Sequence, residues 1–148
     1  MSQFVPSRSE PDASQEAAQI RNILLVDDSD FERFAIRAAV EGLTDFRVCG
    51  EAANGIDAIK MATELKPDLV VMDLAMPLMN GLEAATILKN AMPGVPIVLL
   101  TLYADEVQAP KSSAFGIATV LSKVDGLAPL LECLEKLLDQ PRDQVRPV

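Results

Sequence analysis

The segment DLVVMD, residues 68–73, decides the fold, because there an unbroken apolar run ends in an acid. Four similar runs lie before and after it: NILLV (22–26), FRVCG (46–50), PIVLL (96–100) and ATVLS (118–122). The runs lack regular polar alternation, which is typical of strands that are buried on both faces of a parallel sheet. They recur about every 20–30 residues, the length of one strand–helix unit with its loops.

The segments between the runs are predicted to be helices. Asn54 precedes the segment GIDAIKMATEL, and Asp57 stands three residues after it, which is the pattern of a capped helix N-terminus. The last segment carries its one proline, Pro129, in the first turn, where a missing N–H costs little. Its apolar residues fall at helical spacing and are Leu127, Leu130, Leu131, Leu134, Leu137 and Leu138.

Glycine and proline mark where helices should end. Gly94, between Pro93 and Pro96, predicts the C-cap region of the helix before it. In the segment 104–115, Pro110 should kink, split or shorten a helix. Five strands that alternate with five helices predict an α/β fold, a doubly wound (βα)5 three-layer sandwich.

Composition excludes several classes of protein. The 148 residues include 13 Lys+Arg, 22 Asp+Glu and no His, with a formal net charge of −9. The absence of His excludes Ser-His-Asp and Cys-His catalysis and His-ligated zinc. The acidic balance argues against nucleic-acid contact by this chain. Cys49 and Cys133 are expected to be two buried apolar side chains, and not a disulfide or a metal pair.

The two ends of the chain are predicted to be disordered. Residues 1–20 are polar, with few large apolar side chains, and residues 140–148 have no periodicity, so 21–139 is expected to be the domain. The chain has neither an apolar run of the ~20 residues that span a bilayer nor the apolar core of a signal peptide. We therefore expect a cytoplasmic protein that does not enter a membrane.

Polar side chains follow four of the predicted strands. In the flavodoxin-like order 2-1-3-4-5, ligands bind at the carboxyl ends of the strands, where strands 1 and 3 are neighbours. Asp27 and Asp28 follow the first strand and Asp73 follows the third, so these acids should converge. Thr101 and Lys123, from the fourth and fifth strands, should lie beside them.

A single acid at a strand end is most simply a helix cap, and Asp27 or Asp28 could cap the segment SDFERFAIRAAV. Three carboxylates together, however, repel one another, and capping does not require that cost. A hard cation such as Mg²⁺, which takes carboxylate, water and phosphate oxygens, would offset it. The loop DDSD would repel a flavin phosphate, and no GxGxxG follows the first strand, so flavin and dinucleotide sites are not expected.

Four motifs in this order resemble the receiver domain of bacterial response regulators, over about residues 21–139. They are the acidic pair in LLVDDSD, the loop MDLAMPLMNG, the hydroxyl in VLLT and the lysine in LSKVDG. A haloacid-dehalogenase-type phosphatase would need a second acid two residues after Asp73, where this chain has Ala75. That enzyme class is therefore not favoured.

The resemblance implies a role for each candidate residue. Asp73 would accept a phosphoryl group from a phosphohistidine, and Thr101 and Lys123 would contact its oxygens. Mg²⁺ would be bound by Asp27, mainly through a water, by Asp28 and Asp73 directly, and by the backbone carbonyl of Ala75. Such a chain is not an enzyme beyond its own phosphoryl transfer and dephosphorylation.

The resemblance also implies partners. These are a sensor histidine kinase or histidine phosphotransfer protein, and a downstream protein or a C-terminal output domain that this chain lacks. A homodimer through the fourth helix, fifth strand and fifth helix is a further partner that the family implies.

Three departures from the family concern signal output, and they leave a second hypothesis open. Val120 stands where many receivers have an aromatic residue, Val124 where many have proline, and Pro110 disturbs the fourth helix. Ala75 and Tyr103 occupy the two positions that tune phosphoryl lifetime in the family. The alternative is a pseudo-receiver, a protein-interaction module that phosphorylation does not switch.

Overall fold

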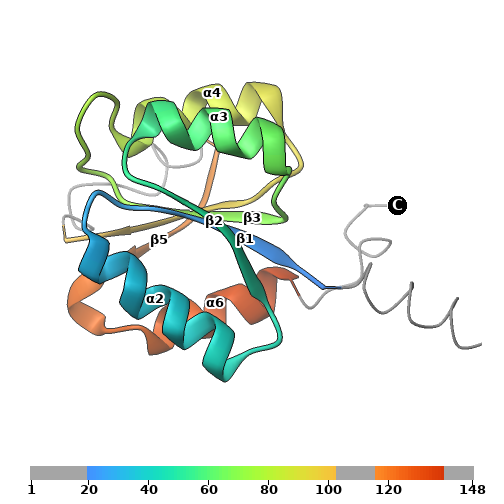
Figure 1. Ribbon diagram of the computed structural model, residues 1–148, viewed down its shortest axis with the longest axis vertical. Coiled ribbons are helices and arrows are strands. Elements are labelled where there is room, and N and C mark those ends of the chain that lie inside the picture. The colour runs from blue at the N-terminus through green and yellow to red at the C-terminus, as the bar shows by residue number, and fades with distance from the viewer. Residues whose placement is uncertain (1–19, 103–115, 139–148) are drawn as a thin grey trace, which may run out of the picture.

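The computed structural model describes residues 20–102 and 116–138. Over these residues the chain forms a five-stranded parallel sheet in the order β2-β1-β3-β4-β5. Helices cover both faces of the sheet (Figure 1), which confirms the predicted α/β three-layer fold and its strand order. The two ends that were predicted to be disordered lie outside the described residues, apart from Ile20. The segment around Pro110 lies outside them as well.

All five strands begin and end within two residues of the predicted runs. They are β1 (Asn22–Val26), β2 (Arg47–Ala52), β3 (Leu69–Met72), β4 (Ile97–Thr101) and β5 (Ile117–Ser122). The largest difference is in β2, which continues to Ala52. The register of β2 shifts against β1, where Ile23 pairs with Val48 and Leu24 with Gly50, so β2 contains one extra residue.

The described helices form the two outer layers. They are α2 (Asp30–Leu43), α3 (Gly55–Leu65), α4 (Gly81–Ala91) and α6 (Ala128–Leu138), with a short 3-10 helix η2 (Lys123–Asp125) after β5. In Figure 1, α3 and α4 cover one face of the sheet and α2 and α6 cover the other. Within these ranges, none of the helices has the length and apolar character that a membrane crossing requires.

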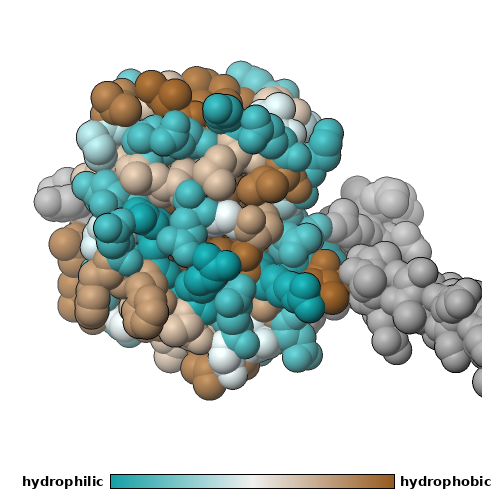
Figure 2. Space-filling view, viewed as in Figure 1, coloured by the Kyte–Doolittle hydropathy of each residue, from teal (hydrophilic) through white to brown (hydrophobic). Residues whose placement is uncertain are grey.

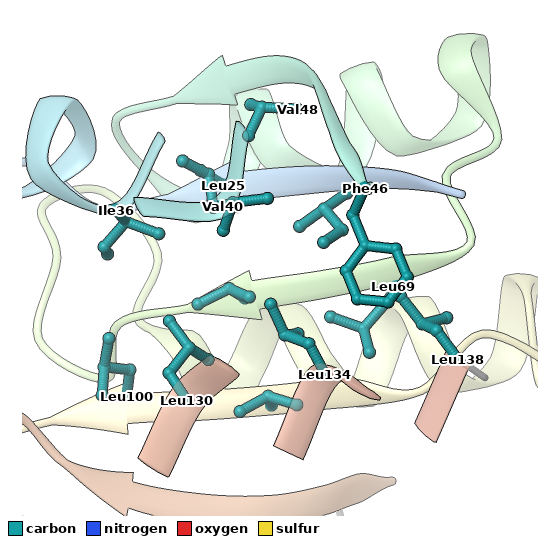
Figure 3. Packing of buried hydrophobic residues seen from close by; sticks show 13 residues of the cluster. Leu25, Ile36, Val40, Phe46, Val48, Leu69, Leu100, Leu130, Leu134 and Leu138 are labelled. Atoms are coloured by element: carbon teal, nitrogen blue, oxygen red, sulfur yellow. The ribbon is translucent and has the colours of Figure 1, made fainter. Parts of the chain in front are cut away.

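Alternation along the strands gives each face its own hydrophobic core. In β1, Ile23 and Leu25 belong to the core under α2 and α6, whereas Leu24 and Val26 belong to the core under α3 and α4. Figure 3 shows the first of these cores. Three leucines of the predicted last helix, Leu130, Leu134 and Leu138, are buried there. Burial on both faces explains why the strands read as continuous apolar runs.

One predicted helix cap is confirmed and another is wrong, although its helix does end in the predicted segment 91–96. Asn54 caps α3, because its Oδ1 accepts a hydrogen bond of 2.8 Å from the Asp57 amide. By contrast, α4 ends at Ala91 and its C-cap is Met92, whose amide donates to the Leu88 carbonyl at 2.6 Å. Gly94 lies beyond this cap and lacks the positive φ of a glycine C-cap.

The cysteines are free, as expected, but only half-buried. Cys49 lies in β2, at the edge of the sheet, and Cys133 packs at the border of the core under α2 and α6. Partial burial nevertheless raises the pKa of the Cys49 thiol. Neither thiol lies among the acids described below.

Candidate functional site

Three carboxylates meet at the carboxyl ends of β1 and β3. Asp27 and Asp28 directly follow β1, and Asp73 directly follows β3, which pairs with β1. One carboxylate oxygen of each acid lies within 4.8 Å of those of the other two. Asp27 and Asp73 are buried, whereas Asp28 is exposed. The structure therefore brings together the three acids that the strand order predicted would converge.

Lys123 bridges the acids of the two strands. Its Nζ lies 2.8 Å from Asp27 Oδ2 and 3.2 Å from Asp73 Oδ2, and the lysine side chain is 12% exposed. Lys123 is the first residue of η2, immediately after β5. A third acid, Glu32 of α2, lies at 4.0 Å from the same nitrogen. The ammonium thus lies inside the acidic cluster.

Burial and charge oppose each other at this bridge. Burial raises the pKa of Asp73, the Lys123 charge lowers it, and the nearby Asp27 charge raises it further; the net direction is upward. Burial by itself lowers the pKa of Lys123, but the hydrogen bond that its ammonium donates to Asp27 and the charges of Asp73 and Asp27 outweigh burial, so this pKa is raised. Lys123 therefore stays cationic, and one ammonium faces three carboxylates.

The helix after β1 is capped by Ser29, and not by either acid. Ser29 Oγ accepts a hydrogen bond of 3.2 Å from the Glu32 amide, and Ser29 is the N-cap of α2. Asp27 Oδ1 instead accepts a hydrogen bond of 2.9 Å from the Ser29 amide. The alternative in which Asp27 or Asp28 caps this helix is therefore wrong, because a hydroxyl one residue further on performs that role.

The loop that carries Asp73 is held against the start of α4. The Asp73 amide donates to the Val26 carbonyl at 2.9 Å, and the Gly81 amide donates to the Leu74 carbonyl at 2.8 Å. A Cβ atom on Gly81 would lie only 2.3 Å from the Asp73 carbonyl oxygen. Because a side chain at position 81 would collide with this oxygen, glycine permits the close approach of α4 to Asp73. Leu78, in the same loop, has a left-handed backbone with φ of 68° and is 78% exposed.

Two of the remaining candidate residues, Thr101 and Ala75, lie at the same edge of the sheet. Thr101 is the last residue of β4, next to β3, and is fully buried. Ala75 is exposed in the loop two residues after Asp73. Val120, in β5, packs against the core under α3 and α4, and Val124, which follows Lys123, is 75% exposed. Tyr103 lies outside the described residues.

Two charged residues beside the site did not emerge from the sequence motifs. Arg33 Nη1 donates to the backbone carbonyl of Asp27, and Arg33 Nε donates to Glu51 Oε1 at 2.9 Å. Glu51 lies near the carboxyl end of β2, next to β1. Glu51 directly follows the second apolar run, whose strand is next to the first in the predicted order, and this is the signal that could have identified the pair.

The donor set fits a hard divalent cation. Asp27, Asp28 and Asp73 offer carboxylate oxygens, and no His or Cys belongs to this cluster of the described residues. Oxygen donors suit Mg²⁺ and Ca²⁺, whereas zinc and copper sites use imidazole or thiolate. The negative charge that Lys123 leaves uncompensated also favours a cation.

Comparison with known proteins identifies the fold and the motifs as those of one family. Residues 23–135 match the response regulator receiver domain. Response regulator protein VraR of Staphylococcus epidermidis is 34% identical over 114 residues, which cover 77% of this chain and 54% of that protein. The chain therefore spans about half the length of the curated relatives that it matches.

Solved structures agree with this match. A LuxR-family two-component response regulator from Aurantimonas is 29% identical, with a TM-score of 0.76 over 81% of this chain and 86% of that one. The response regulator domain of Thermotoga maritima CheB is 28% identical, with a TM-score of 0.74 over 82% of this chain and 98% of that one. The chain described here belongs to the response regulator receiver domain family of two-component signalling.

Proposed function

We propose that Asp73 accepts a phosphoryl group and that its modification switches a protein-binding surface. The observation that carries this proposal is the Lys123 ammonium held between Asp27 and Asp73, 3.2 Å from an Asp73 carboxylate oxygen. A buried acid of this kind, at a strand end and with a perturbed pKa, is typical of a functional site. A site built only for stability would not need three acids together.

The transfer needs little covalent chemistry from the protein. A carboxylate oxygen of Asp73 would attack the phosphorus of a phosphohistidine, and the P–N bond would break. Its electron pair would leave with the imidazole of the donor, and an acyl phosphate would form on Asp73. Phosphoryl transfer depends mainly on positioning and charge stabilisation, and Lys123 would pair with a phosphoryl oxygen.

Magnesium would complete the site. Asp27, Asp28, Asp73 and the backbone carbonyl of Ala75 would hold it, with Asp27 acting mainly through a water. When bound, Mg²⁺ supplies positive charge to the phosphoryl oxygens. Thr101, at the end of β4, would donate its hydroxyl to one of those oxygens and carry the change from the site to the switched surface.

Apolar side chains around the site support a protein as the phosphoryl donor. Phe31 and Phe34, on the first turns of α2, are 76% and 70% exposed, and Val124 beside Lys123 is 75% exposed. Figure 2 shows apolar side chains gathered on the lower left, where Figure 1 places the N-terminal end of α2 and the segment before α6. Large exposed apolar patches mark protein contacts. A histidine kinase or a histidine phosphotransfer protein would therefore dock here.

The switched surface is expected on the opposite edge of the sheet from β2. It would include β5, α6 and the helix predicted in the segment 104–115, and would contact a downstream protein, an output domain or a second copy of the chain. To change a two-state equilibrium from 1:99 to 99:1, phosphorylation must favour one state by about 5.5 kcal/mol.

Intact-mass measurement after incubation with Mg²⁺ and acetyl phosphate tests the proposal. The wild-type chain should gain the mass of one phosphoryl group, and Asp73→Asn should gain none. Asp57→Asn is the matched control, because Asp57 is an exposed acid in the first turn of α3. If the wild type stays unmodified, or if Asp73→Asn is modified equally, Asp73 is not the acceptor; the unmodified result would favour the pseudo-receiver.

A further inference from the structure

The backbone of Asp27 is held by a side chain from α2. Arg33 Nη1 donates to the Asp27 carbonyl, its Nη2 pairs with Asp30, and its Nε donates to Glu51 Oε1 at 2.9 Å. The Arg33 side chain is only 14% exposed. One planar guanidinium therefore connects the end of β1, the first turn of α2 and the end of β2.

This guanidinium is itself anchored. The second oxygen of Glu51 accepts a hydrogen bond of 2.6 Å from Arg37 Nη1, and these two arginines lower the pKa of Glu51. Glu41, further along α2, has one oxygen 3.5 Å from Arg37 Nε, and its other oxygen accepts a hydrogen bond of 3.0 Å from the Val48 amide. The ion-pair network thus fixes one side of α2 along β2.

The contacts around Asp27 leave Asp28 between two fixed neighbours. The Asp27 amide donates to the Ala52 carbonyl at 3.0 Å, the Asp27 carbonyl accepts from Arg33, and Asp27 Oδ1 accepts from the Ser29 amide at 2.9 Å. Asp28 is exposed, so it lacks the packing that holds Asp27 and Asp73. The direction of its carboxylate therefore depends on the backbone on either side.

We infer that Arg33 is a positioning residue for the metal-binding loop, which it holds through the backbone carbonyl of Asp27. The inference rests on the proposed function, because it takes Asp27, Asp28 and Asp73 as ligands of Mg²⁺. Arg33 would not touch the ion. It would hold the Asp27–Asp28 peptide in the orientation that lets both acids face Asp73.

Charge and positioning predict opposite effects of removing Arg33. A cation beside a metal site repels Mg²⁺, so its removal should tighten binding if Arg33 acted only through its charge. If Arg33 holds the loop, its removal should weaken binding, because the acids lose their fixed orientation. The direction of the change in affinity therefore separates the two roles.

Calorimetric titration of the full chain with MgCl₂ tests the inference. Arg33→Gln should raise the Mg²⁺ Kd by about 10–100-fold, the effect usual for a residue that orients metal ligands. Arg37→Gln is the matched control, because it also removes one cation that pairs with Glu51. Arg37 bonds to Glu51 and Glu41 and does not hold the Asp27 carbonyl, so the Kd of this variant should stay within about threefold of the wild type.

Arg33→Lys keeps the charge and tests the role of the fork-shaped guanidinium. Lysine cannot contact Asp27 and Glu51 in the same planar arrangement, so we expect a Kd between those of the wild type and Arg33→Gln. If Arg33→Gln does not fold by circular dichroism, a weakened Kd in folded Arg33→Lys still supports the inference, and an unchanged one overturns it. Unchanged or tighter binding in folded Arg33→Gln also overturns it.

Different results would contradict the proposed Mg²⁺ site and the proposed role of Arg33. No binding heat for the wild type, or equal heats for the wild type and Asp28→Asn, would contradict the metal site itself. Binding by the wild type that Asp28→Asn abolishes, together with an unaffected Arg33→Gln, would contradict only the role of Arg33.

Discussion

Replacement of Gly81 by alanine should destabilise the fold and displace the acceptor. The new Cβ would lie 2.3 Å from the Asp73 carbonyl oxygen and 3.1 Å from both the Asp73 carbonyl carbon and Leu74 Cα. All three are backbone atoms, so α4 and the loop must separate by about 1 Å to reach an ordinary contact. Overpacking of this kind costs about 1–3 kcal/mol, and alanine regains only about 0.5–1 kcal/mol through its helix propensity.

Gly42→Ala makes the same chemical change where there is space. Gly42 lies in the last turn of α2, and a Cβ there would meet nothing within 4 Å. This variant should therefore gain about 0.5–1 kcal/mol of stability. Urea denaturation of both variants measures the free energy of unfolding, and the two alanines should move it in opposite directions.

Gly81→Ala should also impair phosphorylation of Asp73. A displacement of about 1 Å at a reacting group can lower the rate on the order of 10²-fold. The phosphorylation rate is measured by intact mass with acetyl phosphate in excess. The reaction contains no urea and is run at a temperature at which the variant is folded. If Gly81→Ala is as stable as Gly42→Ala and is phosphorylated at the wild-type rate, the close approach of α4 to Asp73 does not position the acceptor.

Three further substitutions test local features. Ser29→Ala should lower the free energy of unfolding by about 1 kcal/mol in urea, because the N-cap of α2 is lost. Leu78→Asn should raise it by about 1 kcal/mol, since asparagine tolerates the left-handed backbone of this exposed position better than leucine; a loss of stability would contradict that. Glu51→Gln should make the free energy of unfolding depend less on pH in the acidic range. Its pairing with Arg37 and Arg33 lowers the pKa of Glu51, so the stability it contributes is present above the unfolded pKa of about 4.3 and is lost as the pH falls through the lower folded pKa. The difference in urea midpoint between the wild type and Glu51→Gln should therefore become smaller as the pH is lowered from about 6 to about 3.

The sheet was predictable because burial on both faces leaves a strong signal. The runs around Leu69 and Ile97 contain almost no polar residue, and their recurrence predicted a parallel sheet with its strand ends at one edge. Once the order of the strands was assumed, the convergence of Asp27 and Asp73 followed from topology. Their hydrogen bonds did not follow, because the sequence does not say that the Lys123 ammonium reaches both acids.

Features that depend on one hydrogen bond or one torsion angle were not predictable. Ser29, Asp28 and Asp27 are all good cap residues, and only the backbone geometry selects Ser29. The C-cap of α4 is Met92 and not Gly94, and Leu78 has a left-handed backbone that favours glycine, so residue type alone indicates neither feature. The Arg33–Glu51 pair joins a helix to an edge strand; the strand order places Glu51 near the acidic loop, but the spacing of the two residues along the chain does not show that they bond.

The most direct test of the shared metal pocket is the thermal unfolding of three proteins with and without Mg²⁺. Mg²⁺ should raise the Tm of the wild type and of Asp57→Asn but not that of Asp28→Asn. A ligand that binds only the folded state stabilises that state, by about 2.7 kcal/mol when its concentration is a hundred times Kd. Equal shifts in Asp28→Asn and Asp57→Asn, or no shift in the wild type, would contradict the claim that acids from β1 and β3 bind a magnesium ion together.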